Sequence, residues 1–263
     1  SPCRRTSVFS VSCTKYITGR GGGSSTDRFS RPCPPPGLRS IFVRMIDDGR
    51  TRFGTACVLA GGQGRRMEGR DKLALEFRGE RLLARIERQL RGRFADLVAV
   101  SNRPDAFRGL GYRVVPDTFS GAGPLAGLHA GLVAARGEWV YLVACDMPFF
   151  SAAHVDALAA AVAEAEAAGR SPVAAAVRSG AFFEPFHALY SRSLVGSIEA
   201  AFAAPGRAPS IQSLLRSLPM AFLDSSPAVD GSSLFVNVNT PVELAAAEAG
   251  TLIADLGGTV TLR

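Results

Sequence analysis

The segment Leu59 to Lys72, LAGGQGRRMEGRDK, combines a run of glycines with basic side chains that could bind phosphate. It follows the apolar run Ala56 to Leu59, which has the length and composition of a buried strand. Glycines let backbone N–H groups approach a ligand closely, and Arg65, Arg66 and Lys72 suit the negative charge of a polyphosphate. The segment is therefore a candidate nucleotide-binding loop, and a glycine-rich loop with solvated charges is the alternative interpretation.

Two standard phosphate-binding motifs do not fit this segment. Gly64 and Gly69 have the glycine spacing of a Walker A loop, but Arg70-Asp71-Lys72 follows where that motif has Lys and then Ser or Thr. A dinucleotide-binding fingerprint begins with Gly62-Gln63-Gly64, but Met67 occupies the position of its third glycine. A nucleotide would have to be bound here in some other way.

Asp146 is the second candidate for chemistry. It follows the apolar run Trp139 to Ala144, which is typical of a central parallel strand covered on both faces. Open α/β sheets bind ligands at the carboxyl ends of their strands, and a carboxylate there can hold Mg²⁺ together with phosphate oxygens and waters. Asp146 is therefore the candidate metal ligand, with a turn or helix N-cap aspartate as the alternative.

Short apolar runs alternate with helical patterns from residue 54 onward. This alternation predicts βαβ units and a three-layer α/β fold with a mostly parallel sheet. A last helix is marked by Thr240 at the N-cap, Pro241 after it and an acid, Glu243, three residues after the cap. The predicted strands are residues 56–59, 96–101, 112–115, 139–144, 173–177, 186–190 and 234–238. The predicted helices are residues 81–92, 128–135, 152–168, 194–203, 211–218 and 241–250.

The net charge of the chain is concentrated near its start. The chain has 263 residues and a net charge of +7. Residues 1–44 contain eight basic residues and one acidic residue, which accounts for the whole excess and leaves the rest of the chain neutral. A basic surface on the folded part is therefore not indicated, and we expect no nucleic-acid partner.

We interpret residues 1–53 as a disordered basic leader that need not belong to the native protein, because it contains GGGSS and CPPPG and has no regular period. Its Arg- and Ser-rich composition also resembles an organellar transit peptide, but the globular pattern begins shortly after Met45, so upstream translation or a dispensable leader is the expected origin of residues 1–44. No Pro-, Gly- or Ser-rich linker interrupts residues 54–250, which predicts one domain, and residues 251–263 are expected to form a C-terminal tail.

The cysteines and the hydropathy indicate a cytoplasmic protein. Cys57 and Cys145 lie in apolar segments and are expected to be buried and reduced. No CxxC pair is present, which argues against a zinc site, and no apolar run approaches the roughly 18 residues of a membrane span. We therefore expect no membrane association.

The loop LAGGQGRRMEGRDK resembles the signature of the molybdenum cofactor guanylyltransferases. The family pattern is Leu-Ala-Gly-Gly, then Arg-Met-Gly, then Asp-Lys, and Glu68 stands where a glycine is common. The resemblance covers about residues 55–245. Further matches are Asn102, Asp117, the block Gly123-Pro124-Leu125-Ala126-Gly127-Leu128, Asp146 in CDMP, and Asn237 and Asn239 in NVNTP.

This resemblance implies a nucleotidyltransferase with a glycosyltransferase-A-like, Rossmann-type sheet, the nucleotide-diphospho-sugar-transferase fold. It implies that GMP is transferred from Mg²⁺-bound GTP to molybdenum-loaded molybdopterin, giving molybdopterin guanine dinucleotide and pyrophosphate. Molybdopterin-delivery proteins and recipient molybdoenzymes are the further partners that it suggests.

The resemblance also assigns roles to residues. Asp146 would hold Mg²⁺, and Arg66 and Lys72 would neutralise phosphate charge. Asn237 and Asn239 are assigned to the pterin or metal side. Glu184-Pro185-Phe186-His187 resembles a segment near the pterin, with a structural role as the alternative. The GTP-binding residues that it implies are Leu59, Ala60, Gly61, Gly62, Lys72, Asn102, Asp117 and Asp146.

Two alternative functions remain open. Cytidylyltransferases that act on the same cofactor also resemble this sequence, but their loop more often has Ala-Ala-Gly and lacks the Asp before Lys. Gly61-Gly62 and Asp71-Lys72 therefore favour guanine. The other alternative is a carrier that binds the nucleotide or the cofactor without catalysis, although a pure binder has no need of both Asp146 and Lys72.

Overall fold

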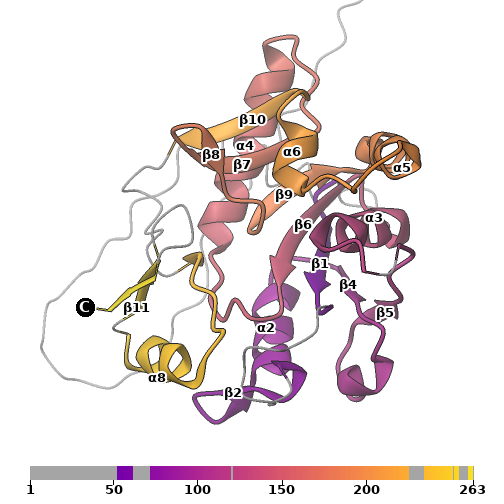
Figure 1. The fold of residues 1–263 in the computed structure, drawn as a ribbon. Coiled ribbons are helices and arrows are strands. Elements are labelled where there is room, and N and C mark those ends of the chain that lie inside the picture. Colours follow the sequence, from indigo (N-terminus) through magenta and orange to yellow (C-terminus); the bar gives the residue numbers. More distant parts are fainter. Residues whose placement is uncertain are drawn as a thin grey trace, which may run out of the picture. The chain divides into compact units, whose positions relative to one another are not determined.

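A mostly parallel sheet of eight strands runs through the computed structural model of the protein (Figure 1). The structure describes residues 52–61, 72–119, 121–224, 234–250, 252–254 and 260–262. All of these residues belong to the second of the two units into which the chain divides, Pro35–Arg263.

The strand order is β10-β7-β9-β6-β1-β4-β5, and β8 pairs with β7. Strand β1 is parallel to both β4 and β6, β4 is parallel to β5, and β7 is parallel to β10. Strand β9 is antiparallel to both of its neighbours, β6 and β7. The prediction of a mostly parallel sheet is therefore confirmed. The strands are β1 (Thr55–Leu59), β4 (Asp96–Val100), β5 (Arg113–Val115), β6 (Trp139–Ala144), β7 (Ala174–Ser179), β8 (Phe182–Phe183), β9 (Ala188–Ser191) and β10 (Met220–Asp224).

The helices agree closely with the expected ones. Helix α3 begins at Pro124, with Gly123 as its N-cap, and so includes the rest of the block Gly123 to Leu128. Helix α8 begins after Thr240, whose side chain accepts a hydrogen bond from the Glu243 N–H as predicted, and it ends at Gly250 with φ 72°. In the described part of the chain, no helix combines the length and the hydropathy of a membrane span. The α-helices are α2 (Leu82–Arg91), α3 (Pro124–Ala134), α4 (Ala152–Ala167), α5 (Val195–Ala203), α6 (Ile211–Leu215) and α8 (Pro241–Ala249), and the 3-10 helices are η1 (Lys72–Ala74), η2 (Pro104–Phe107) and η3 (Arg192–Leu194).

Both faces of the sheet are covered by helices. Alternate residues of β1 enter two different cores, because successive side chains of a strand point to opposite faces. Ala56 and Val58 pack with residues of α2 and α4. Cys57 and Leu59 pack with residues of α3, α5 and α6. The three-layer arrangement predicted from the sequence is confirmed, and Cys57 is buried as expected.

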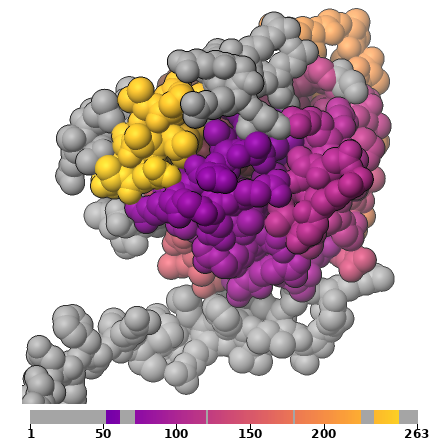
Figure 2. Space-filling model, turned by 90° about the horizontal axis from the view of Figure 1, so that it is seen from below, coloured from indigo at the N-terminus to yellow at the C-terminus, as the bar shows by residue number. Residues whose placement is uncertain are grey.

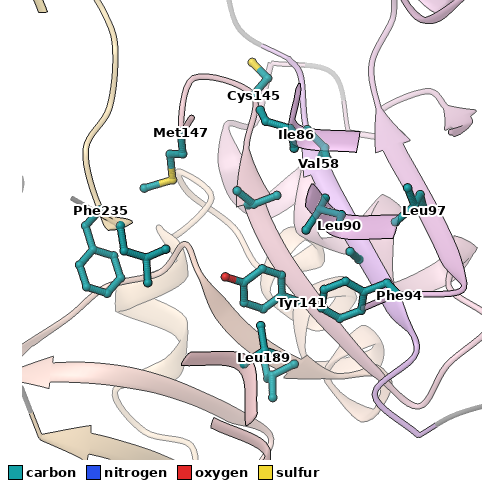
Figure 3. Close-up of a cluster of buried hydrophobic side chains, with 14 of the residues drawn as sticks. Val58, Ile86, Leu90, Phe94, Leu97, Tyr141, Cys145, Met147, Leu189 and Phe235 are labelled. Carbon is teal, nitrogen blue, oxygen red and sulfur yellow. The ribbon is translucent and has the colours of Figure 1, made fainter. Parts of the chain in front are cut away.

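The core on the α2 and α4 side is rich in aromatic rings (Figure 3). Phe94 stacks on Tyr141 with ring centroids 5.3 Å apart. Met147 and Phe235 belong to the same cluster although both come from segments without regular structure. This core therefore extends beyond the carboxyl end of β6 and includes the chain that precedes α8.

The strand predicted at residues 234–238 is wrong. Residues 236–239 have no regular secondary structure, and the Val238 N–H donates to the Asp146 carbonyl at 2.9 Å. Phe235, Val236 and Val238 are buried in the core instead. A short apolar run can be buried in this way without a sheet partner, so its pattern alone does not identify a strand.

The structure contains several strands that the sequence did not reveal. A two-residue hairpin turn, Arg78 with φ 52° and Gly79 with φ 72°, joins β2 (Glu76–Phe77) to β3 (Glu80–Arg81). The Arg78 side chain reaches the Glu248 carbonyl at 2.9 Å, and Figure 2 shows the yellow residues of α8 against the purple residues of this region. Strand β10 and the antiparallel pair β11 (Leu252–Ala254) and β12 (Val260–Leu262) are also additions to the expected elements.

Helix α3 lies unusually close to β1, and two glycines make this possible. A Cβ atom at Gly127 would lie 3.0 Å from Leu59 Cδ2, and one at Gly131 would lie 2.4 Å from Cys57 Sγ. Because real Cβ atoms do not approach neighbours to 2.4 Å, a side chain at position 131 would push α3 away from the sheet. The small residues of this block therefore set the distance between a helix and the central strand.

We predict that Gly131→Ala destabilises the protein by about 1–3 kcal/mol, the usual cost of overpacking a core. Gly196→Ala on α5 is the matched control, because a Cβ there meets nothing within 4 Å. It should stabilise the protein by roughly 0.5–1 kcal/mol, since Ala is the better helix former. Urea unfolding measures both changes, and Cys57→Ala should partly rescue Gly131→Ala. Equal effects of the two glycine substitutions would contradict this explanation.

Candidate active site

The carboxyl ends of the parallel strands β6, β1, β4 and β5 meet at one edge of the sheet. The Ala60 N–H donates to the Val100 carbonyl at 3.0 Å, which joins the ends of β1 and β4. The Cys145 N–H donates to the Leu59 carbonyl at 3.0 Å, which joins the ends of β6 and β1. The chain segments that leave these strands, including Gly61, therefore start side by side. This is the edge at which open α/β sheets bind ligands.

Asn102 and Asp117 lie together at this edge. The Ser101 N–H donates to the Val115 carbonyl at 2.9 Å, so the ends of β4 and β5 are joined. Asn102 Oδ1 accepts a hydrogen bond from the Asp117 N–H at 3.2 Å. Asp117 Oδ1 in turn accepts from the Phe119 N–H at 3.1 Å. Two positions that are fifteen residues apart in the sequence thus form one hydrogen-bonded turn.

Lys72 joins two other predicted site residues. Its Nζ lies 3.0 Å from Asp146 Oδ2 and donates to Asn239 Oδ1 at 2.8 Å. The side chains of Lys72 and Asp146 are 24% and 16% exposed, so the ion pair is accessible but mostly shielded from water. Lys72 begins η1, Asp146 follows β6, and Asn239 precedes α8. Three segments that are far apart in the chain meet at this cluster.

The cluster suits a metal ion that arrives with a polyphosphate. Asp146 provides one carboxylate, and no group of three or more His, Cys, Asp or Glu side chains suitable for a metal occurs among the described residues. Mg²⁺ typically takes one or two carboxylates and completes its shell with substrate phosphates and waters. The carboxylate of Asp146 fits such a shared metal, and the residues therefore fit the expected ion.

Asn237 and Asn239 make different contacts. Side chains two residues apart on a strand share one face, but this segment is not a strand, so strand geometry does not place the two side chains together. Asn237 Oδ1 is buried and has no hydrogen-bond partner among the residues that the structure describes. Asn239 contacts Lys72, as described above. The assignment of Asn237 to the pterin or metal side stays a prediction.

Part of the glycine-rich loop is outside the described residues. Leu59 and Ala60 are buried at the end of β1, and Gly61 is exposed. Gly62 and Arg66 lie in the segment 62–71 that the structure does not describe, as do Arg65 and Glu68. The predicted roles of these residues stay predictions.

The N-terminus of α3 is a further feature of this edge. The helix begins after Gly123, whose φ is 77°, and contacts the end of β1 at Leu59 through Gly127. No side chain caps the helix at Gly123. Unpaired N–H groups and the positive end of the helix dipole favour an anion at such a position.

Residues 184–187 connect β8 to β9 and form a large bulge opposite β7. Arg178 pairs with Phe183, and Ala175 pairs with Leu189. These two pairs are three residues apart on β7 but six residues apart on the chain from β8 to β9, which therefore has three extra residues. The Glu184 N–H still donates to the Val177 carbonyl at 3.0 Å, so the residues displaced from the ladder are 185–187. Pro185 lies in this excursion, where a residue without an N–H does not disrupt pairing.

The bulge lies beside the carboxyl end of β6, because the next residue, Ala188, pairs with Leu142. It buries a hydrogen-bonded network that the sequence did not reveal. Tyr141 Oη lies 2.6 Å from His187 Nδ1, and His154 Nε2 donates to the His187 carbonyl at 2.7 Å. Burial lowers the pKa of His187 to about 3 and also lowers that of His154, so both imidazoles are neutral at pH 7.

Of the titratable groups in the bulge, Glu184 has the pKa nearest to pH 7. Burial raises its pKa from the ordinary 4.5 to about 7, against the opposing effect of a hydrogen bond from the Phe186 N–H. That bond reaches Glu184 Oε1 at 3.1 Å. The only sequence signal for the bulge was the Glu-Pro pair at its start, since Pro within an apolar run indicates a bulge or an edge.

The fold and the site define an α/β protein with a mostly parallel three-layer fold and a charged group, the Lys72–Asp146 pair, at the carboxyl edge of its sheet, where such sheets bind ligands. Comparison with known proteins makes this class more specific. The chain belongs to the MobA-like NTP transferase domain family, whose model matches residues 56–221.

Curated relatives and a solved structure agree with this family. The chain is 36% identical over 200 residues to a probable molybdenum cofactor guanylyltransferase of Peptoclostridium acidaminophilum, covering 75% of this chain and 89% of that protein. It is 36% identical over 193 residues to a molybdenum cofactor guanylyltransferase of Syntrophotalea carbinolica, covering 72% and 88%. The molybdopterin-guanine dinucleotide biosynthesis protein A of Archaeoglobus fulgidus has a similar structure, with TM-score 0.60, 26% identity and coverage of 74% and 97%. The family and fold inferred from the sequence are confirmed.

Glu184→Gln should stabilise the protein at high pH. A carboxyl with a raised pKa in the folded state holds a proton that the unfolded chain has lost, so stability falls as pH rises from about 4.5 to about 7 and is constant above that. The substitution removes this loss, which is on the order of 3 kcal/mol at about 1.4 kcal/mol for each pKa unit. Urea unfolding at pH 5 and pH 8 should show a gain mainly at pH 8. A gain of equal size at both pH values would contradict the assignment.

Proposed function

We propose that this protein transfers GMP from GTP to the phosphate of molybdenum-loaded molybdopterin and releases pyrophosphate. Family membership supports nucleotidyl transfer, and the names of the relatives support this nucleotide and this acceptor. The structural observation that carries the proposal is the contact of Lys72 with Asp146 and Asn239 at the carboxyl edge of the sheet. A carboxylate and an ammonium group placed there suit a metal-bound triphosphate.

The acceptor phosphate needs no general base. A phosphate monoester has a second pKa near roughly 6, so it is largely dianionic at neutral pH. One of its oxygens attacks the α-phosphorus of GTP, a new P–O bond forms, and the bond from the α-phosphorus to the bridging oxygen of pyrophosphate breaks. The three histidines take no part in this step. Their contacts are His129 with Glu199, His154 with the His187 carbonyl, and His187 with Tyr141.

The protein would contribute position and charge. Lys72 neutralises negative charge on the triphosphate and on the departing pyrophosphate. Leu59 to Gly61 present backbone groups to the nucleotide, and the Asn102–Asp117 turn holds its nucleoside part. Mg²⁺, held by Asp146, would neutralise the triphosphate oxygens and organise them for displacement. Arg66 adds positive charge from the glycine-rich loop.

Removing either charge of the pair should reduce turnover strongly. We predict that Asp146→Asn and Lys72→Met each lower pyrophosphate release on the order of 10²-fold or more, the scale for loss of a charge-stabilising group. Asp156→Asn is the matched control, because Asp156 also pairs with a basic side chain, Arg93, at 3.0 Å and is similarly shielded, at 20% exposed. Thermal unfolding should show that all three variants fold. Near-normal turnover of Asp146→Asn would exclude Asp146 from the site.

Parallel assays with GTP, CTP and ATP, with and without molybdopterin, decide the nucleotide. We expect pyrophosphate release that requires molybdopterin and is fastest with GTP. Faster release with CTP would instead establish the cytidylyltransferase alternative, which keeps the same fold. Binding of GTP without pyrophosphate release under any condition would establish the non-catalytic carrier.

A further inference from the structure

The segment that precedes α8, at Val238 and Asn239, forms hydrogen bonds with both members of the Lys72–Asp146 pair. The Val238 N–H donates to the Asp146 carbonyl at 2.9 Å, which fixes the main chain of the carboxylate residue. The next residue, Asn239, accepts from Lys72 Nζ at 2.8 Å, which fixes the ammonium group. A main-chain contact of Val238 and a side-chain contact of Asn239, at two successive positions, therefore converge on one charge pair.

Asn239 is itself held by Glu243. Its N–H donates to Glu243 Oε2 at 2.6 Å, and the Glu243 N–H donates to Thr240 Oγ1 at 3.1 Å. In a standard capping box the acid at the third helical position accepts from the N–H of the N-cap residue itself. Here the carboxylate binds the N–H one residue earlier, and that residue is the one whose side chain contacts Lys72. Helix capping alone does not explain this choice of partner.

We propose that Glu243 is a positioning residue for Lys72 and acts through Asn239, a role that rests on the proposed function. A lysine ammonium group lies at the end of a flexible four-carbon chain, so a single carboxylate partner does not fix the position of Nζ. Asn239 supplies a second acceptor from another direction, which defines the position of Nζ. Glu243 keeps that acceptor in place because it fixes the backbone of Asn239.

The position of the ammonium group matters to the reaction. Lys72 has to meet charge as it develops on the pyrophosphate, and a displacement of about 1 Å at such a group can cost on the order of 10²-fold in rate. Before the reaction, by contrast, the negative charge of bound GTP is shared among several groups, so GTP binding depends less on the exact position of Lys72. Loss of the position of Lys72 should therefore lower kcat more than it raises the KM for GTP.

The experiment compares Glu243→Ala, Glu243→Gln and Thr240→Ala. Thr240→Ala is the matched control, because it removes the other side-chain cap of α8 and leaves the Asn239–Glu243 contact in place. We expect Glu243→Ala to lower kcat on the order of tenfold with a KM for GTP within about twofold of the wild type. Glu243→Gln keeps an oxygen for the Asn239 N–H and should restore most of kcat. Thr240→Ala should lower the urea midpoint without this loss of kcat.

A double variant shows whether the effect passes through Lys72. In the Lys72→Met background, Glu243→Ala should cause no further loss of kcat, because coupled residues are not additive. Equal losses of kcat in Thr240→Ala and Glu243→Ala, or a full further loss in the Lys72→Met background, would overturn the proposal.

A readout that does not depend on turnover separates this proposal from the proposed function. The rate at which Lys72 is acylated by a succinimidyl ester, followed by peptide mass spectrometry, should rise severalfold in Glu243→Ala and stay unchanged in Thr240→Ala. Failure of every nucleotide to release pyrophosphate would reject the proposed function alone. Unchanged Lys72 acylation in Glu243→Ala would reject the positioning role alone.

Discussion

The contact of Lys72 with Asp146 and Asn239 is the interaction on which the arrangement of the site depends. The lysine is 74 residues from the aspartate and 167 residues from the asparagine in the sequence. Each charge is shielded from water enough that loss of its partner would leave a costly unpaired group. The same contact therefore holds η1, the end of β6 and the segment before α8 together, and it places two opposite charges at the carboxyl edge of the sheet.

The parallel strands explain why this edge collects functional groups. Strands β6, β1, β4 and β5 all run the same way, so the chain emerges from each of them on the same side. Main-chain hydrogen bonds such as Cys145 N–H to Leu59 join the emerging segments directly. Helix α3 can approach β1 closely because of Gly127 and Gly131, which brings its N-terminus to the same edge. Close packing and strand direction thus bring these main-chain segments to one edge, and the Lys72 contact then fixes the side chains there.

The reversed strand β9 introduces a different constraint. Its direction brings the bulge at residues 184–187 to the end of β6, where His187 adopts φ 49°, an uncommon conformation for a non-glycine residue. Tyr141 and His154 bond to this residue and stabilise the conformation. Burial raises the pKa of Tyr141, so its hydroxyl keeps its proton and shares a hydrogen bond with His187 Nδ1. The network is therefore a set of neutral groups beside the carboxyl-terminal half of β6.

The sequence by itself determined the elements whose signals are local. Apolar runs and helical periods predicted the central strands, the helices and the three-layer class, and the cap at Thr240 predicted the start of α8. The motif residues Lys72, Asn102, Asp117 and Asp146 were also predicted as site members, because they match the family signature. Asn102, Asp117 and Asp146 moreover lie at or just after the end of a strand. Their roles in catalysis stay predictions.

Only the tertiary structure decided which groups touch. The apolar pattern of residues 234–238 suits a strand equally well, but burial in the core leaves this segment free to bond Asp146 and Lys72 instead. The partner of Glu243 depends on the path of the chain before α8, and the pKa of Glu184 depends on its burial by residues distant in sequence. Contacts of this kind have no local signal, because they arise only when segments far apart in the chain pack against one sheet edge.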